Sequence, residues 1–188
     1  EKFSLTEKDS GTFLEWSIRT DDNDSFERTN TTNIGLGRQI TPQYFTQLHY
    51  STAFRAPNFN ELYVEGAYSK ANPLLRPEKS ELIEWKHLWQ IETHTIEMSL
   101  FKSNVQDLIL SNFKDGFFVA ENIGIAQIQG TELYWQFPIM SWQNSLSMTW
   151  LKPEDKATGL ILPKRAQRLL KWSTYYRYGK QGFGYNFT

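Results

Sequence analysis

The sequence lacks cysteine entirely, and it lacks any long hydrophobic run. Without cysteine, neither a disulfide framework nor thiol chemistry is available to the protein. No apolar stretch approaches the roughly 18 residues that a membrane-spanning helix needs. The formal net charge is only −1, so charge of one sign does not dominate. Bulk electrostatics therefore gives no reason to expect a nucleic-acid partner.

Arrangements of catalytic or metal-binding residues are also missing. The three histidines, His49, His87 and His94, lie far apart and lack metal-site spacing, which favours a structural role for them. The acidic run at residues 21–24 lacks the glycine and the distal glutamate of an EF-hand loop, so we interpret it as a solvated turn. No Ser-His-Asp set, carboxylate pair or phosphate-binding glycine loop stands out. We expect neither an enzyme nor a bound cofactor.

The chain is instead rich in aromatic residues, which make up 15% of it, although its mean hydropathy is low at −0.55. Outer-membrane barrels have this composition because aromatic girdles surround a polar lumen. Strand-like alternation of apolar and polar residues runs through most of the sequence. The residues expected to face lipid are Leu14, Trp16, Ile18, Leu48, Tyr50, Trp85, Trp89, Leu133, Trp135, Leu146, Met148, Trp150 and Trp172. Those expected to face the lumen are Glu15, Gln47, Glu84, Glu132 and Lys171.

The predicted connections alternate between compact turns and longer or more polar loops. Compact turns are expected near residues 6–10, 39–43, 92–94, 138–142 and 179–181, and the other loops near 21–25, 56–78, 112–116 and 152–164. An up-and-down meander places the first group at one rim and the second, external group at the other. We therefore expect an all-β fold, an antiparallel up-and-down transmembrane β-barrel, with a soluble β-sandwich as the alternative.

The longest interval without a strand pattern is Ala53–Glu81, between two strongly alternating segments. Its three prolines cannot donate to a sheet ladder, and unstructured connections of this length are usually functional. At its start, Arg55 is expected to pair with Glu61 or Glu78 and hold the loop in place. The alternative is that Arg55 contacts a ligand or another domain.

Aromatic and amide side chains are concentrated in the same loop. Phe59, Tyr63 and Tyr68 offer ring faces, and Asn58 and Asn60 offer hydrogen-bonding groups. Binding sites commonly combine aromatic walls with a few polar anchors. These residues either form a ligand platform or pack the loop against its neighbours.

Three segments of the chain resemble the TonB-dependent outer-membrane receptors. The first is the pair FRAPNFNELY and NPLLRPEKSE at residues 54–63 and 72–81, which is similar to the family's FRAPN and NPxLxPE segments. The second, at residues 122–132, is NIGIAQIQGTE, similar to the family's N-x-G-x-x-x-I-x-G-x-E strand. The third and weaker one, at residues 101–109, is FKSNVQDLI. They occur in the family's order over about the middle half of the chain.

The resemblance implies a bacterial outer-membrane receptor that takes up a scarce, bulky nutrient. Family barrels have about 22 strands and a plug domain that contacts TonB. We therefore expect residues 1–188 to be part of such a barrel, with about eight to ten strands and no plug. Besides TonB, the implied partners are membrane lipid, lipopolysaccharide and the nutrient. The residues expected to bind the nutrient are Arg55, Asn58, Asn60, Tyr63 and Tyr68.

Within the family, three features look most like those of cobalamin receptors. They are the compact loops, the segment FNELY at residues 59–63 and the segment LPKRAQRLLKW at residues 162–172. Ferric siderophore or haem receptors are the alternative. The second of these segments contains the basic residues Lys164, Arg165 and Arg168, which are expected to face lipopolysaccharide phosphates or acidic neighbours. Two other classes remain open: a small self-contained outer-membrane barrel with a structural or adhesion role, and a soluble β-rich binding module.

Overall fold

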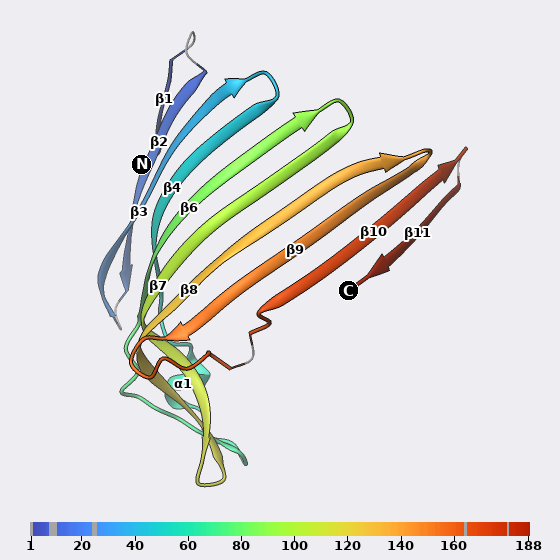
Figure 1. Ribbon diagram of the computed structural model, residues 1–188. Helices are drawn as coiled ribbons and strands as arrows, with labels where there is room; N and C mark the ends of the chain where they lie inside the picture. Colours follow the sequence, from blue (N-terminus) through green and yellow to red (C-terminus); the bar gives the residue numbers. More distant parts are fainter. Residues whose placement is uncertain (1, 8–10, 24–25, 164, 180) are drawn as a thin grey trace.

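The computed structural model describes residues 2–7, 11–23, 26–163, 165–179 and 181–188, without the side chains of residues 2–7, 23 and 27. Ten strands form one antiparallel sheet in the order β1-β2-β3-β4-β6-β7-β8-β9-β10-β11 (Figure 1). Their bounds are β1 Lys2–Glu7, β2 Thr12–Asn23, β3 Phe26–Thr41, β4 Tyr44–Arg55, β6 Glu78–Ile91, β7 His94–Lys114, β8 Phe117–Ile139, β9 Trp142–Asp155, β10 Arg168–Tyr178 and β11 Gln181–Phe187. This meander confirms the predicted all-β, antiparallel, up-and-down fold.

The sheet is curved and open, as expected of part of a larger barrel (Figure 1). Within the described residues, β1 pairs only with β2 and β11 only with β10. The connection between β4 and β6 contains the short helix α1 (Phe59–Tyr63) and the two-residue strand β5 (Ser69–Lys70). Neither was predicted. No helix among the described residues is long and apolar enough to cross a membrane.

The connections sort into the two predicted groups, but some are shorter than predicted. Residues 152–155, which were predicted to begin a loop, belong to β9 and pair with β8. Compact turns at residues 42–43, 92–93 and 140–141 lie at one end of the sheet, and the connections 56–77 and 156–167 lie at the other (Figure 1). The predicted loop at 112–116 is wrong, because residues 112–114 still pair with β8. Only Asp115 and Gly116 form the turn, both with positive φ, as the Asp-Gly pair of a tight hairpin requires. The predicted turn near 21–25 is also shorter than expected, because residues 21–23 belong to β2, and residues 24 and 25 lie outside the described residues.

The register separates polar from apolar side chains as predicted. Directly opposed residues of paired strands share a face, so the ladder extends each face across the sheet. One row on the polar face runs Gln47, Lys86, Ser99, Glu132 and Thr149. A row on the apolar face runs Leu48, Trp85, Leu100, Thr131 and Trp150. All residues expected to face lipid lie on the apolar face, and all those expected to face the lumen lie on the polar face.

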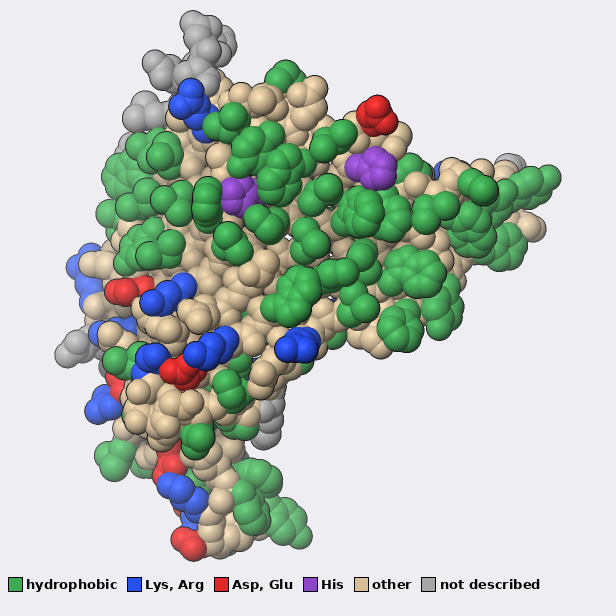
Figure 2. Space-filling model, viewed as in Figure 1, with side chains coloured by type: hydrophobic (Ala, Val, Ile, Leu, Met, Phe, Trp, Pro, Cys, Tyr) green, Lys and Arg blue, Asp and Glu red, His purple; other side chains and the backbone are tan. Residues whose placement is uncertain are grey.

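The apolar face is largely uncovered, although its side chains are large. Leu48 is 52% exposed and Trp85 is 48% exposed. A contiguous exposed apolar surface of this kind marks contact with a membrane or a partner. Figure 2 shows the hydrophobic side chains gathered in a broad band over the strands.

The apolar band ends abruptly toward the long-loop end of the sheet. The row through Ile83 contains two lysines, Lys102 and Lys152, and the next row contains Glu81 and Glu154. From Ile91 to Ile83 the band covers about 27 Å along a strand. That length is comparable with the roughly 25 Å apolar band of outer-membrane barrels. Strands β7 and β8 continue well beyond it as a projecting hairpin (Figure 1).

Aromatic rings border the band at the compact-turn end. Tyr44 and Trp89 stack with ring centroids 5.1 Å apart, and the buried His87 shares a 2.8 Å hydrogen bond between its Nδ1 and the Tyr44 hydroxyl. Trp135 and Phe137 stack at 4.1 Å on β8, which is separated from β6 by β7. Such rings suit the membrane–water interface because they are apolar with polar tips. His87 therefore has a structural role in the girdle.

Glycine is required at position 130 because backbone and side chains crowd the space where a Cβ would lie. A Cβ there would lie 2.4 Å from the Trp150 carbonyl oxygen and 3.0 Å from the Phe101 ring. Gly124, six residues earlier on the same strand, has no such neighbours within 4 Å. Close packing thus explains why the last glycine of the N-x-G-x-x-x-I-x-G-x-E segment, Gly130, has no room for a larger side chain.

We predict that Gly130→Ala destabilises a complete receptor carrying this segment by about 1–3 kcal/mol, since overpacking forces strands apart. Unfolding in guanidinium, followed by tryptophan fluorescence, measures the change. Gly124→Ala is the matched control and should stay within about 1 kcal/mol of the parent. Equal stability of the two variants would contradict the packing role of Gly130.

Candidate functional site

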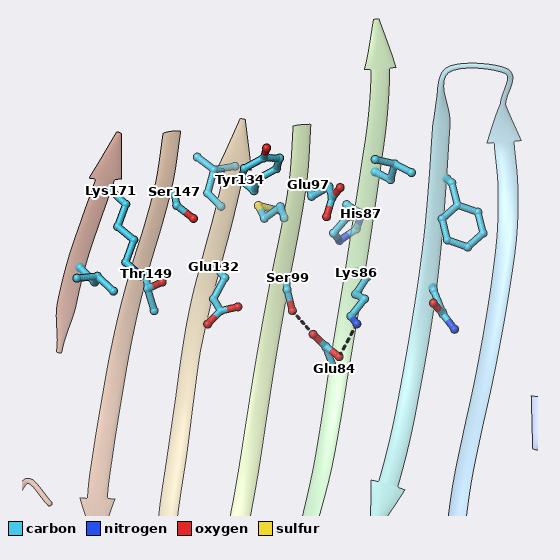
Figure 3. A pocket seen from close by; sticks show the side chains of 16 residues that line it. Glu84, Lys86, His87, Glu97, Ser99, Glu132, Tyr134, Ser147, Thr149 and Lys171 are labelled. Atoms are coloured by element: carbon cyan, nitrogen blue, oxygen red, sulfur yellow. Dashed lines mark hydrogen bonds and ion pairs between the residues drawn. The ribbon is translucent and has the colours of Figure 1, made fainter. Parts of the chain in front are cut away.

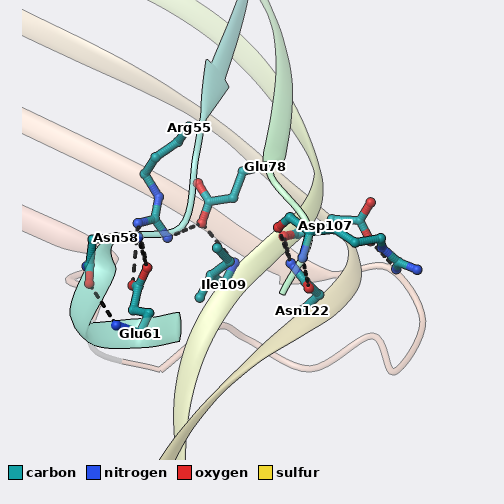
Figure 4. Close-up of polar contacts among 8 residues, drawn as sticks. Arg55, Asn58, Glu61, Glu78, Asp107, Ile109 and Asn122 are labelled. Atoms are coloured by element: carbon teal, nitrogen blue, oxygen red, sulfur yellow. Dashed lines mark hydrogen bonds and ion pairs between the residues drawn. The ribbon is translucent and has the colours of Figure 1, made fainter. Parts of the chain in front are cut away.

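The loop between β4 and β6 is held at its base by the Glu78 carboxylate, which has two hydrogen-bond partners, and by a second carboxylate, Glu61. Arg55 and Glu78 are opposed in the register, and Arg55 Nη2 donates to Glu78 Oε1 at 2.7 Å (Figure 4). The backbone N–H of Ile109, on β7, donates to the same oxygen at 2.8 Å. Arg55 Nη1 also lies 3.4 Å from Glu61 Oε1. The prediction that Arg55 holds the loop is confirmed, with both acidic partners.

The environment of Glu78 favours its charged form. Its side chain is only 13% exposed, and burial acts to raise the pKa of the carboxyl. The hydrogen bonds from Arg55 and from the Ile109 amide outweigh burial, so the pKa lies below its ordinary value. The ion pair is therefore maintained at neutral pH.

Helix α1 begins at a reciprocal cap. The Glu61 backbone N–H donates to Asn58 Oδ1, and the Asn58 N–H donates to Glu61 Oε2, each at 2.8 Å. This is a capping box, which satisfies two otherwise unpaired amide groups at the helix start. The N-x-x-E spacing of residues 58–61 was the sequence signal for this helix. At five residues, α1 is too short to show a helical period.

The buried side of the loop packs on the projecting hairpin. Leu62 of α1 and Leu75 form a small core with Ile109 of β7 and Ala120 of β8, each less than 10% exposed. Asn72 Nδ2 donates to the Ala120 carbonyl at 2.8 Å, joining the loop to β8. Packing and hydrogen bonding thus order a connection that would otherwise be mobile.

A second polar cluster closes the far side of the loop. Asn122 Nδ2 donates to the carbonyls of Arg76 and Asp107, at 2.8 and 2.7 Å, and Asn122 Oδ1 accepts from the Arg76 N–H (Figure 4). The Arg76 guanidinium also pairs with the Asp107 carboxylate. We call Arg55, Glu61, Glu78, Asp107 and Asn122 the loop bracket. All three motif segments supply residues to it.

The predicted ligand residues fall into two groups. Arg55 and Asn58 make their polar contacts inside the loop bracket and the helix cap. Tyr63 is 60% exposed and Tyr68 73% exposed, and Asn60, on α1, is also exposed. The adjacent Phe59 is also exposed, with its ring centroid 5.3 Å from that of Tyr63. The loop therefore presents rings and an amide outward from a fixed base.

Positive charge on the loop is already engaged. Arg55 and Arg76 pair with carboxylates, and Lys70 Nζ lies 4.4 Å from the centroid of the Phe117 ring. Lys79 lies on the apolar face of β6, by the alternation of that strand. The loop thus offers an anionic ligand little free positive charge.

A separate groove of about 550 Å³ lies on the polar face (Figure 3). Glu84 accepts a 2.6 Å hydrogen bond from the Ser99 hydroxyl and lies 3.2 Å from Lys86 Nζ. Glu97, Glu132 and Lys171 also line it. Gln47, Glu84, Glu132 and Lys171 were predicted to face the lumen, but Glu97 and Ser99 were not singled out. No group of His, Cys, Asp or Glu side chains in the described part of the chain could hold a metal ion.

We predict that Glu78→Gln loosens the loop by about 1–3 kcal/mol, because a charge-assisted hydrogen bond to Arg55 is lost. Hydrogen exchange of the α1 amides in a complete receptor carrying this segment measures that opening. Glu81→Gln, three residues further along β6 on the opposite face, is the matched control and should exchange as the parent does. Faster exchange in both variants alike would contradict the role of the loop bracket.

The same carboxylate predicts a pH dependence. The folded pKa of Glu78 lies below the ordinary value of 4.5, so its stabilising effect is complete above 4.5. The effect is lost as the pH falls through the lower folded pKa. Exchange of the α1 amides, corrected for intrinsic rates, should therefore accelerate in that range for the parent and much less for Glu78→Gln. Identical acceleration in both proteins would exclude Glu78 as the titrating group.

Comparison with known proteins identifies a family of β-barrel receptors that this chain resembles in sequence and fold. The sequence model of the TonB dependent receptor-like β-barrel family matches residues 3–188. The chain is 32% identical over 173 residues to the vitamin B12 transporter BtuB of Vibrio vulnificus (strain YJ016), covering 90% of this chain and 27% of that protein. It is 30% identical over 168 residues to BtuB of Photobacterium profundum, covering 87% of this chain and 27% of that protein. The chain thus spans about a quarter of the length of the curated relatives it matches.

Solved structures share the fold at lower identity. The copper transporter OprC has a TM-score of 0.81 at 15% identity, over 97% of this chain and 32% of that one. The siderophore receptor PirA from Acinetobacter baumannii has a TM-score of 0.78 at 18% identity, over 98% and 32%. The chain belongs to the TonB dependent receptor-like β-barrel family, whose members are receptors and transporters of the Gram-negative outer membrane.

Proposed function

We propose that residues 1–188 form part of the barrel of a receptor for TonB-dependent uptake of cobalamin. The observation that carries this proposal is the identity of 30–32% to proteins named vitamin B12 transporters, over 87–90% of the chain. The solved siderophore and copper receptors are only 15–18% identical over a similar share, which supports the fold and no ligand.

The chemistry of the loop supports a neutral, amide-bearing ligand. Tyr63, Tyr68 and Asn60 are exposed and offer ring faces and hydrogen bonds, which suit the amide-decorated rim of cobalamin. Arg55 and Arg76, which an anionic ferric siderophore would need, are paired with carboxylates. Arg55 and Asn58 fix the loop, and Asn60, Tyr63 and Tyr68 contact the ligand. A rigid loop loses little entropy when it binds.

The receptor barrel also contacts a plug domain, membrane lipid and lipopolysaccharide. A plug domain outside this chain occupies the lumen and connects the receptor to TonB. The polar face, with its charged groove, lines that lumen, and the apolar face contacts lipid and lipopolysaccharide. The loops 56–77 and 156–167 are external, and the compact turns face the periplasm.

We predict that replacing both Tyr63 and Tyr68 by Ala in a complete receptor carrying this segment weakens cobalamin binding by about 1–3 kcal/mol, as loss of aromatic anchors does. Equilibrium binding of cyanocobalamin to outer-membrane preparations measures this. Tyr178→Ala is the matched control, since Tyr178 is 71% exposed at the opposite rim. It should leave affinity unchanged.

Two other outcomes separate the parts of the proposal. If the parent receptor binds a ferric siderophore or haem and not cyanocobalamin, the ligand is wrong. If it binds cyanocobalamin equally well with both tyrosines replaced, the loop has no ligand role. Uptake of labelled cobalamin that persists in cells without TonB would contradict the proposed energy coupling.

A further inference from the structure

A groove of about 690 Å³ crosses the apolar face where the apolar band meets the polar rows above it. Trp85, Leu100 and Trp150 line its apolar part, and they occupy one register row across β6, β7 and β9. Trp85 is 48% and Trp150 44% exposed, so no part of the described chain covers them. The groove could accommodate hydrocarbon chains lying against the sheet.

Three cations border the same groove. Lys102 and Lys152 flank Gln129 in the next register row, and Arg168 is opposed to Trp150. Since neighbouring strands are about 4.8 Å apart, the two lysines are about 10 Å apart at the backbone. Figure 2 shows Lys and Arg side chains in a row along the lower border of the hydrophobic band.

These cations are available to a ligand. Within the described residues, neither Lys102 nor Arg168 forms an ion pair. Lys152 Nζ lies 2.8 Å from Glu154 Oε2, but Lys156 Nζ also binds that carboxylate, at 2.9 Å. Glu154 therefore keeps a partner if Lys152 turns toward an incoming anion.

We infer that this groove is a specific site for lipopolysaccharide, the phosphorylated acyl lipid of the outer leaflet. Its acyl chains pack on Trp85, Leu100 and Trp150, and its phosphates bind Lys102, Lys152 and Arg168. The site rests on the proposed orientation, in which the long loops are external. The proposed function gives the apolar face a general contact with lipid, and this inference adds one cluster of residues that binds the lipid headgroup.

The arrangement favours this lipid over a soluble anion. Cations at the border of an apolar band suit a molecule whose phosphates are joined to acyl chains. The phosphates bind the cations while the acyl chains pack on the apolar side chains. Inorganic phosphate would gain nothing from the tryptophans. Of the basic residues predicted from sequence to face lipopolysaccharide, Arg168 lies in the groove, Arg165 lines a smaller cavity, and Lys164 lies outside the described residues.

The test uses a complete receptor carrying this segment, purified in detergent. Purified lipopolysaccharide is titrated in and bound lipid is followed by native mass spectrometry. The variant Lys102→Gln, Lys152→Gln, Arg168→Gln should bind lipopolysaccharide on the order of tenfold to a hundredfold more weakly, since each cation near a phosphate surface contributes to affinity. The control Lys86→Gln, Lys171→Gln, Arg177→Gln removes the same charge from the polar face and should bind as the parent does.

Titrations with two other ligands show whether the bound phosphate belongs to a lipid. Dephosphorylated lipid A should bind weakly to the parent, and inorganic phosphate should not displace lipopolysaccharide. Affinity within about twofold of the parent for the groove variant, or equal binding of dephosphorylated lipid A, overturns the inference. If the variant does not fold, lipopolysaccharide should still protect Lys102 and Lys152 of the parent from acetylation, and absence of protection overturns it. Cobalamin binding should be unchanged in the groove variant, which separates this site from the proposed ligand loop.

Discussion

Backbone hydrogen bonding in a continuous antiparallel ladder is the constraint on which the rest of this structure depends. In hydrocarbon an unpaired peptide group costs several kcal/mol, so each spanning strand needs a neighbour on both sides. The chain meets this need in the simplest way, because each long strand pairs with the next long strand along the sequence. The resulting register places every second side chain on the same face. One face is then free to be apolar and the other polar.

The long β7–β8 hairpin gives the loop between β4 and β6 a surface on which to fold. Beyond the apolar band the hairpin is no longer limited by lipid, and its Ile109, Ala120 and Asn122 contact the loop directly. Glu78 joins the two by accepting from Arg55 and from the Ile109 amide. The loop is therefore ordered by an element far away in sequence. Its side chains Tyr63 and Tyr68 remain exposed.

Charge is divided in space according to what surrounds it. Cations in the loop are paired with carboxylates in the loop bracket, whereas Lys102 and Arg168 remain unpaired within the described residues at the border of the apolar band. Salt bridges inside the loop stabilise its shape, and unpaired cations at a membrane border attract anionic headgroups. The sheet thus combines a loop whose cations are paired with a border of the apolar band whose cations Lys102 and Arg168 have no ion-pair partner among the described residues.

The sequence by itself determined the strands and their two faces, because alternation with a period of two is a local property that each strand displays on its own. It also predicted a connection near residues 112–116, though with the wrong start, and the pairing of Arg55. Only the tertiary structure decided the rest. Residues 112–114 were mistaken for a loop, since a strand outside the membrane has no continuous apolar face to reveal it.

Helix α1 is too short to show a helical period in the sequence. Leu62 is buried only because Ile109 and Ala120, from strands distant in the sequence, pack against it. The loop bracket likewise joins residues far apart in the chain, from Arg55 to Asn122, and such contacts are set by the register of the whole sheet rather than by any local pattern.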